Sequence, residues 1–358
     1  MMKRIFITGV TGLVGSYLAK IFLQNQYIVY ALARSKNNQS AKKRVLNILK
    51  FWDKNIFKKI KNLIILEGDI TKKNLGLSSK NAKKVMEEIE EIFHCAAITK
   101  FNLPIDVIRK PNVEGTKNVL DFALSCKNLK KINHISTAYV AGNHKGVFKE
   151  ENLDLGQNFD TTYEQSKFEA EKLVEEYRKK GLWIDIFRPP LIIGESITGK
   201  TPLFNMAVYQ VLHLWKQEIL DIFPAKDVNV NIVPVDWLCQ SIYLIFSKTT
   251  TKNRNYHPFS SQTICLENIM NWLAEKIGFK KPKVVTPFEF KNFKLSVIQK
   301  LLLANNLAIF NPYLVLDSSL TLGILKQYGF VFPKITKKSF LPILLWPFTV
   351  KFKSEISI

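Results

Sequence analysis

Short apolar runs alternate with helical patterns along the first 190 residues of this chain. Six runs, rich in β-branched and aromatic residues, each have about the length of one strand. They lie at residues 4–10, 27–34, 62–70, 91–97, 132–142 and 183–194. Between them apolar residues recur at helical spacing, as in residues 13–25 and 113–126. Strands that alternate with crossover helices predict an α/β fold built on a doubly wound parallel sheet.

The alternation is lost after residue 190, where helical patterns mix with Pro-bounded loops. Residues 230–246 predict a short strand and then a helix that returns to the main sheet, and residues 266–278 predict another helix. We expect a cofactor-binding domain and a smaller, mainly helical substrate lobe. The first is assigned residues 1–190 and 225–250, and the second residues 191–224 and 251–358.

The composition indicates a globular protein with a large core. Of 358 residues, 47% are hydrophobic and 23% charged. The formal net charge of +22 favours an acidic partner, such as a phosphorylated cofactor, a membrane surface or an acidic carrier protein. However, 45 of the 52 basic residues are Lys, which an A·T-rich coding sequence would also produce. No zinc-finger, RNA-recognition or basic-zipper pattern is present, so we expect no nucleic-acid partner.

Cysteine and histidine spacing argues against disulfides and against a structural metal. The four cysteines stand singly, and the five histidines lack metal-ligand spacing. The N-terminal stretch MMKRIFITGV is too short for a signal peptide, and no run reaches the roughly 18 apolar residues of a membrane span. We expect a cytoplasmic protein that contacts a membrane, if at all, only at its surface.

Three glycines follow the first strand and open the first helix, in the stretch ITGVTGLVG. Gly9, Gly12 and Gly15 have the spacing Gly-x-x-Gly-x-x-Gly. A tight turn there lets the backbone approach a pyrophosphate, and the helix N-terminus offers free N–H groups and a positive dipole end. The strand before and the helix after these glycines are the context that a dinucleotide-binding loop of Rossmann type requires.

The end of the second strand indicates which dinucleotide would bind. An Asp or Glu there would bind the adenosine ribose, but this chain has ALARSKNNQSAKKR. Arg34 takes that place, and Arg44 follows ten residues later. Because a guanidinium suits a 2′-phosphate, the pattern favours NADP(H) over NAD(H).

A further group of polar residues follows the fifth strand. Ser136 and Thr137 lie where that strand meets the cofactor crevice, in HISTAYVAG. The helical run that starts at TTYEQSK then places Tyr163 and Lys167 at i and i+4, on one helix face. His94 and His134 are interpreted as packed strand histidines, since neither has a partner pattern.

Together these pieces resemble an extended short-chain dehydrogenase/reductase of the NAD-dependent epimerase/dehydratase superfamily. The matching motifs span about 240 residues and are TGVTGLVG, GDI, HCAA, NVEGT, STAYVAG, YEQSK, RPPLIIG and PVDW. Within the superfamily the chain is most similar to the male-sterility-type branch of fatty acyl-CoA reductases and thioester reductases. That narrower resemblance lies in the arginine pair and in GDITKKNLGLS, HCAAITKF, GESITGKT and VPVDW.

The resemblance implies roles for residues in many parts of the chain. Tyr163 would be the general acid, with its pKa lowered by Lys167, which would also hold the nicotinamide ribose. Thr137 would polarise the substrate carbonyl, and Asn112 would support the cofactor or a proton path. The other residues implied in cofactor binding are Gly9, Thr11, Gly12, Leu13, Val14, Gly15, Arg34, Arg44, Asp69, Ile70, Ala96, Ala97, Thr99, Ser136, Pro190 and Ile192.

The activity that the resemblance implies is NADPH-dependent reduction of a long-chain acyl-CoA or acyl carrier protein thioester, to an aldehyde and further to an alcohol if the aldehyde also reacts. A reductase of small carbonyls, hydroxysteroid-like or flavanonol-like, would share the same triad. A sugar-nucleotide epimerase or 4,6-dehydratase is a third alternative. Ala138 and Tyr139 replace the acidic pair that such a dehydratase needs. Relatives that only sense NADP(H) usually lack the Tyr or the Lys, and this chain has both.

Two apolar segments lie near the C-terminus. Residues 293–314 are more apolar than a sugar-nucleotide pocket requires, which favours a lipid substrate, although ordinary core helices have the same pattern. Residues 339–353 are apolar, aromatic and flanked by lysines, and they are too short and Pro-broken to span a bilayer. This tail could lie in a membrane interface with Trp346 and Phe348 inserted, or pack on the lobe or on a second subunit of a homodimer.

Overall fold

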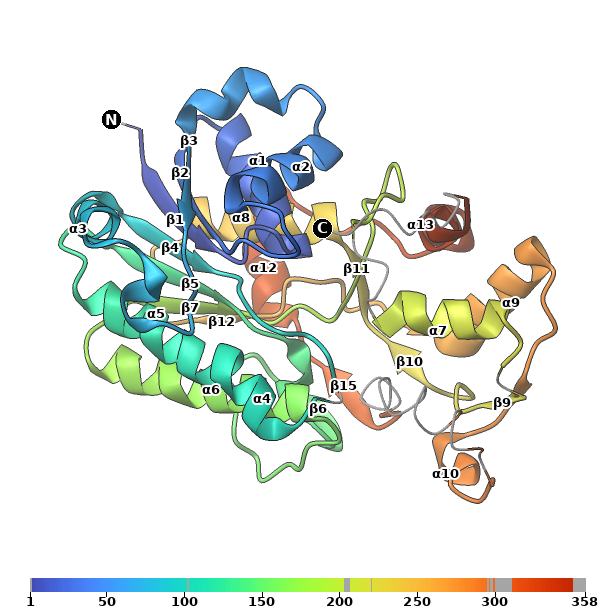
Figure 1. The fold of residues 1–358 in the computed structure, drawn as a ribbon. Helices are drawn as coiled ribbons and strands as arrows, with labels where there is room; N and C mark the ends of the chain where they lie inside the picture. The colour runs from blue at the N-terminus through green and yellow to red at the C-terminus, as the bar shows by residue number, and fades with distance from the viewer. Residues whose placement is uncertain are drawn as a thin grey trace.

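A seven-stranded sheet lies at the centre of the molecule (Figure 1). Its order is β12-β7-β5-β4-β1-β2-β3, and all neighbouring strands are parallel. The strands are β1 (Arg4–Thr8), β2 (Ile28–Ala33), β3 (Leu63–Glu67), β4 (Glu91–His94), β5 (Lys131–Ile135), β7 (Ile184–Phe187) and β12 (Asn255–Tyr256). The computed structural model describes residues 2–101, 103–202, 207–219, 221–294, 296, 299 and 311–349.

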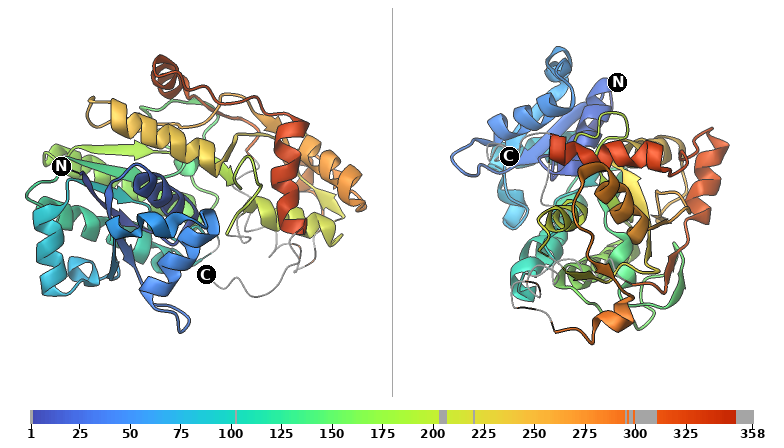
Figure 2. Two further views of the ribbon diagram at one scale, coloured as in Figure 1. Left: turned by 90° about the horizontal axis from the view of Figure 1, so that it is seen from above. Right: turned by 90° about the vertical axis from the view of Figure 1, so that its right-hand side faces the viewer.

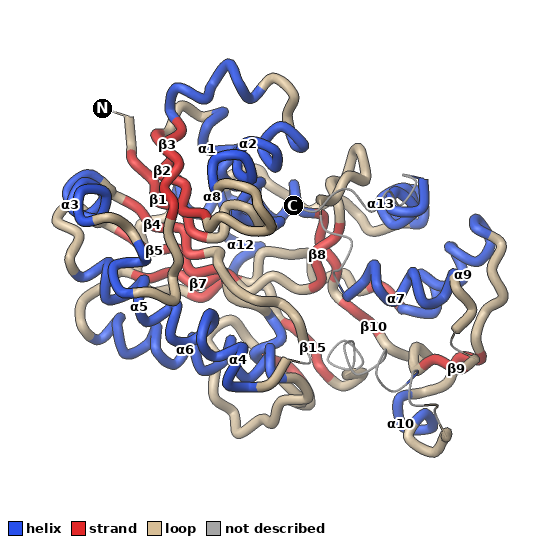
Figure 3. Tube along the Cα trace, viewed as in Figure 1, coloured by secondary structure: helices blue, strands red, loops and turns tan. Residues whose placement is uncertain are grey.

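Helices cover both faces of this sheet (Figure 3). On one face α1 (Leu13–Gln24), α2 (Ala41–Trp52) and α8 (Val235–Lys248) bury apolar side chains in one core cluster. On the other face α3 (Ser79–Glu88), α5 (Gly115–Leu124) and α6 (Thr162–Lys179) contribute to a second. The α/β doubly wound prediction is confirmed, including the helix that returns from residue 235.

The strand order reverses between β1 and β4. The chain runs from β1 outward to β3 and then crosses to β4, on the other side of β1. Crossovers therefore leave in opposite directions at this point, and a crevice opens beyond the carboxyl ends of the two strands. The loops after Thr8 and His94 border that crevice.

The sixth apolar run forms two strands instead of one. β7 ends at Phe187, and after Pro189 and Pro190 the chain continues as β8 (Leu191–Ile193), which pairs with β11 (Ile232–Pro234) outside the main sheet. Proline has no N–H for a strand ladder, so two in succession separate the strands.

The remaining elements are short or belong to a third core cluster. Several lie to one side of the sheet, at the right of Figure 1, and Figure 2 gives two further views. They are η1 (Ile56–Asn62), η2 (Lys73–Gly76), α4 (Ile105–Arg109), η3 (Lys110–Glu114), η4 (Ala138–Ala141), β6 (Gly146–Phe148), α7 (Ala207–Lys216), β9 (Ile222–Phe223), β10 (Asn229–Val230), β13 (Ile264–Cys265), α9 (Leu266–Ile277), β14 (Lys283–Val284), α10 (Pro287–Phe290), β15 (Leu314–Leu316), α12 (Ser319–Gln327) and α13 (Lys337–Thr349).

Two parts of the segment 251–358 lie with the sheet. β12 is its edge strand, and Leu325 of α12 is buried in the cluster formed by α1, α2 and α8. α9 and α13 instead pack together in the third cluster, with α7. Most of the apolar segment 293–314 lies outside the described residues.

The C-terminal tail packs on the lobe, which is one of the arrangements left open by the sequence. Phe340, Ile343 and Leu344 of α13 are fully buried in the third cluster. Trp346 lies over Gly199 and makes an edge contact with Phe51 of α2, with ring centroids 6.3 Å apart. Residues 350–353 of the tail lie outside the described part. Among the described residues, none of the helices is long and apolar enough to cross a membrane.

A buried ion pair joins α6 to the end of β7. Arg188 donates from Nη2 to Glu171 Oε2 at 2.6 Å and from Nε to Glu171 Oε1 at 3.1 Å. Both side chains are completely buried. This bidentate contact fixes the middle of α6, the helix that carries Tyr163 and Lys167, against the sheet.

Candidate active site

The glycine loop is shaped for close approach of a ligand to the backbone. Gly9 has a φ of +68°, and Gly12 N–H donates to Gly9 O at 2.9 Å. A Cβ on Gly9 would lie 2.5 Å from Ala96 N, and one on Gly15 would lie 2.4 Å from Gly9 O. Gly12 is the N-cap of α1 and provides no side-chain hydrogen bond. The loop and the first turn of α1 therefore suit the phosphates of a dinucleotide.

Replacing Gly9 with Ala is expected to lower the free energy of unfolding by about 2–3 kcal/mol, because strain from a positive φ adds to a backbone clash. Gly156 is the matched control, since it has a φ of +75° and no other atom lies within 4 Å of the place that a Cβ would take. Gly156→Ala should cost about 1–2 kcal/mol, from strain alone. Urea unfolding of both variants checks this. Equal losses would mean that the contact with Ala96 does not constrain Gly9.

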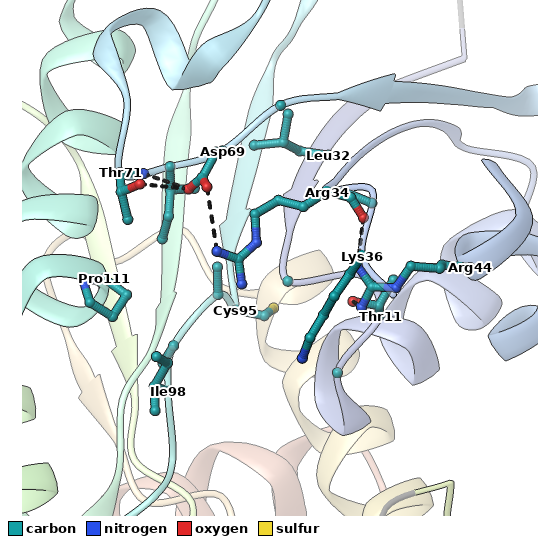
Figure 4. Close-up of a pocket in the computed structure, with 17 residues that line it drawn as sticks. Thr11, Leu32, Arg34, Lys36, Arg44, Asp69, Thr71, Cys95, Ile98 and Pro111 are labelled. Carbon is teal, nitrogen blue, oxygen red and sulfur yellow. Dashed lines mark hydrogen bonds and ion pairs between the residues drawn. The ribbon is translucent and has the colours of Figure 1, made fainter. Parts of the chain in front are cut away.

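A cavity of about 310 Å³ opens between the glycine loop and the ends of β2, β3 and β4 (Figure 4). Nine residues implied by the resemblance line it: Gly9, Thr11, Gly12, Arg34, Arg44, Asp69, Ile70, Ala96 and Ala97. Ile98, between the predicted Ala97 and Thr99, lines it as well. Seven further lining residues were missed by the sequence analysis: Leu32, Ala33, Lys36, Gly68, Thr71, Cys95 and Pro111. Most of these follow strand ends that the analysis had placed, so proximity to a carboxyl end was the available signal.

Basic side chains dominate the end of this cavity that follows β2. Arg44, a largely buried residue of α2, donates to Arg34 O at 2.5 Å and to Thr11 Oγ1 at 3.3 Å. Its buried Nε has no hydrogen-bond partner within the described residues. Arg34 is half-exposed and forms an ion pair with Asp69 at 3.4 Å. Lys36 extends from the same side (Figure 4).

The electrostatics of this group favour an anion. Burial, and then the charge of Arg34, lower the pKa of Arg44. The pKa of Asp69 is also lowered: hydrogen bonds from Thr71 and the charge of Arg34 outweigh the effect of burial, which would raise it. One carboxylate thus faces three basic side chains, and the donor set fits a phosphate group at this end.

The remaining predicted cofactor residues do not line this cavity. Leu13 and Val14, the first residues of α1, are buried in the core, and Gly15 packs on Gly9. Thr99 is exposed, Pro190 is buried, and Ile192 is half-buried against the core. Asn112, Ser136, Tyr163 and Lys167 lie around α6 and the end of β5, which are described next.

α6 starts at a capping box that sets the position of Tyr163. Thr161 Oγ1 accepts from Glu164 N at 3.2 Å, and the Glu164 carboxylate accepts from Thr161 N at 2.9 Å. Tyr163 and Lys167 are both buried and, four residues apart, lie on the helix face toward β5. Lys167 Nζ donates to Ile135 O at 2.9 Å and lies 3.3 Å from His134 Nε2.

The pKa of Tyr163 differs from the expectation. Burial raises it to about 12, and a hydrogen bond with the Thr137 side chain opposes that rise. The expected lowering by Lys167 is wrong for the protein itself, because the ammonium is bound to Ile135 and His134 of β5. Burial lowers the pKa of Lys167 to about 8. Tyr163 is therefore a neutral phenol at neutral pH, which is the form that a proton donor needs.

The side chain of Thr137 forms a hydrogen bond with Tyr163, whereas the side chain of Ser136 does not. Thr137 Oγ1 accepts from Tyr139 N at 3.3 Å and lies 3.5 Å from Pro189 O. The side chain of Ser136 is buried, and its Oγ has no partner in the part of the chain that the structure describes. Of the two hydroxyls, Thr137 is the one placed to act together with the phenol.

Asn112 holds the loop that follows β4. Its Oδ1 accepts from Ile98 N at 2.8 Å, and its Nδ2 donates to Ile98 O at 3.0 Å and to Ser166 Oγ at 2.9 Å. It lies in η3, a short π-helical turn. The amide thus connects the cavity wall at Ile98 with α6, one residue before Lys167.

Comparison with known proteins shows the family of this chain. Residues 7–242 match a family model described as male sterility protein, NAD_binding_4. The chain is 28% identical over 265 residues to nonribosomal peptide synthetase asaC of Aspergillus flavus, covering 71% of this chain and 26% of that protein. It is 25% identical over 310 residues to fatty acyl-CoA reductase wat of Drosophila melanogaster, covering 75% of this chain and 59% of that one.

A solved structure shares the fold along nearly the whole chain. The terminal R domain from the myxalamid PKS-NRPS biosynthetic pathway superposes with a TM-score of 0.81 at 24% identity, covering 97% of this chain and 90% of that one. The chain spans only about a quarter of asaC, and less than two thirds of wat.

Proposed function

This chain belongs to the male sterility protein family, within the extended short-chain dehydrogenase/reductases, and on that premise we propose that it is an NADPH-dependent reductase of an acyl thioester. The substrate would be a long-chain acyl-CoA or an acyl carrier protein thioester, and the first product an aldehyde. The observation that carries the proposal is the hydrogen bond between the side chains of Tyr163 and Thr137, with Lys167 one turn further along α6 and bound to the end of β5.

The preference for NADP(H) is supported by the basic end of the cavity. Arg34, Lys36 and Arg44 line it together, and no acid ends β2. A 2′-phosphate would accept charge-assisted hydrogen bonds from these side chains. The exposed position of Arg34 leaves its guanidinium free to move from Asp69 toward such a phosphate.

Replacing Arg34 with Ala is expected to weaken NADPH binding about 10–100-fold, the effect of one lost charge-assisted hydrogen bond, and to leave NADH binding nearly unchanged. Lys50→Ala, which removes an exposed cation of α2 outside the cavity, is the control. Nicotinamide fluorescence titrations measure both. Equal loss for NADPH and NADH would contradict a role at the 2′-phosphate.

The residues of the crevice can perform the chemistry of the reduction. A bound nicotinamide supplies the hydride that adds to the thioester carbonyl carbon. Thr137 would hydrogen-bond the carbonyl oxygen, and Tyr163 would donate its proton to that oxygen as negative charge develops. Lys167, whose ammonium is bound at the end of β5, would hold the nicotinamide ribose. Cleavage of the carbon–sulfur bond in the hemithioacetal then releases the aldehyde and the thiol.

Turnover with a panel of carbonyl compounds tests the proposal. NADPH absorbance is followed with acyl-CoAs of several lengths, acyl carrier protein thioesters, free aldehydes, simple ketones and nucleotide sugars. We expect oxidation of NADPH that depends on a thioester. Turnover of ketones or nucleotide sugars, with none for any thioester, would replace the proposal with one of its alternatives.

A further inference from the structure

A buried histidine of β5 contacts the ammonium of Lys167. We propose that His134 is a positioning residue, whose Nε2 accepts a hydrogen bond from Lys167 and keeps that ammonium directed at the catalytic crevice. This role rests on the proposed function, because Lys167 matters there as the residue that would hold the nicotinamide ribose. It adds a residue of β5 to the site, beyond the hydroxyl and the Tyr–Lys pair.

The geometry holds the ammonium at two points. Lys167 Nζ lies 3.3 Å from His134 Nε2 and 2.9 Å from Ile135 O. Both acceptors belong to one rigid strand, and His134 and Lys167 are almost completely buried. An ammonium has three N–H donors. Two bonds to β5 therefore fix the orientation of the third, which remains for a ligand in the crevice.

His134 can accept this bond only as a neutral imidazole with its proton on Nδ1. Burial lowers its pKa well below the usual value, and the charges of Lys167, His94 and Arg178 act in the same direction. These groups face it from α6 and from β4, and all are basic. The imidazole is thus neutral near pH 7, where Lys167 is an ammonium.

His94 provides a matched comparison within the same sheet. It is the register partner of His134 across β4 and β5, and the two rings lie 5.2 Å apart. Its nitrogens instead contact Thr8 Oγ1 at 2.8 Å and Thr116 Oγ1 at 3.0 Å. Two buried strand histidines thus differ in one respect that matters here, the direct contact with Lys167.

The contact has a consequence for pH dependence. Burial lowers the pKa of Lys167 to about 8, and the charges of Glu171 on α6 and of Cys95 after β4 oppose that effect. The side chain is therefore charged below that pH and loses its charge above it. A neutral acceptor favours the ammonium, so its removal lowers the pKa further and moves the alkaline limb of activity to lower pH. A residue that merely fills space would leave this limb unchanged.

Three substitutions at His134 separate the alternatives. In Gln the amide reaches the place of Nε2, in Asn it reaches only that of Nδ1, and Leu has no acceptor. The pH profile of kcat/KM, and NADPH affinity against pH, are measured for each variant and for His94→Leu. We expect the pKa of the alkaline limb to fall by about one unit in His134→Leu and His134→Asn, which lowers kcat/KM at pH 8 about fivefold. In His134→Gln and His94→Leu, kcat/KM should fall at the same alkaline pH as in the parent protein.

Each outcome decides the proposal. It is overturned if the pKa of the alkaline limb is unchanged in His134→Leu and His134→Asn. It is also overturned if that pKa falls equally in His134→Gln or in His94→Leu. If His134→Leu does not fold, the Asn and Gln pair decides; if His134→Asn also does not fold, the residue serves the fold and the proposal fails. Absence of thioester turnover in the parent protein counts against the proposed function alone, because NADPH affinity still reports on Lys167.

Discussion

Replacing Tyr163 with Phe is expected to lower kcat for thioester reduction by about 10²–10⁴-fold, the range associated with loss of a general acid. The substitution removes one oxygen from a buried ring, which also contacts Phe101 with centroids 5.3 Å apart. Packing is therefore retained, and NADPH affinity should change little. Stopped-flow or steady-state NADPH oxidation measures the rate, and fluorescence titration measures the affinity.

Tyr177→Phe is the control for this experiment. Tyr177 lies on the same helix and is buried to a similar degree, but its hydroxyl donates to Asp121, away from the crevice. Its replacement should leave kcat within about threefold, since it removes no group that acts in the transition state. Undiminished kcat in Tyr163→Phe would remove the phenol from the mechanism and with it the central argument for the proposed chemistry.

Replacing Glu171 with Ala is expected to lower the free energy of unfolding by about 3–5 kcal/mol, because the Arg188 guanidinium would remain buried without its carboxylate. The pair is fully enclosed, so solvent cannot replace the lost partner. Since Glu171 anchors the middle of α6, activity should also fall as the positions of Tyr163 and Lys167 become less defined. Urea unfolding followed by circular dichroism gives the free energy.

Lys172→Ala tests the neighbouring position on the same helix. Lys172 pairs with Asp154 at 3.0 Å, but both side chains are more than half exposed. Loss of that pair should cost less than about 1 kcal/mol. If the two variants were equally stable, α6 would not depend on its buried anchor.

Local patterns were sufficient for much of the site. The glycine loop follows from three glycines between a strand and a helix, and the Tyr163–Lys167 pair follows from helical spacing. Arg34 and Arg44 were predicted to act together, and the structure places both in the wall of one cavity. Each of these inferences depends on residues close in sequence or on the order of strands.

Other contributors could not be found in this way. Pro111 reaches the cavity from η3, which Asn112 ties to the loop after β4. Lys36 has no distinguishing pattern in a chain so rich in lysine. The contact between His134 and Lys167 joins two elements 33 residues apart, and neither residue has a local signal for it.

The sequence by itself determined the order of strands and helices, the loop that suits phosphates, and the chemical groups available for catalysis, because periodicity, glycine placement and helical spacing are local properties. Only the tertiary structure decided how those groups ionise and what they contact. Burial raises the pKa of Tyr163 and lowers that of Lys167, and the positions of α6 and β5 give the ammonium its acceptors. Desolvation and contact across the sheet depend on packing between distant segments, which no short stretch of sequence contains.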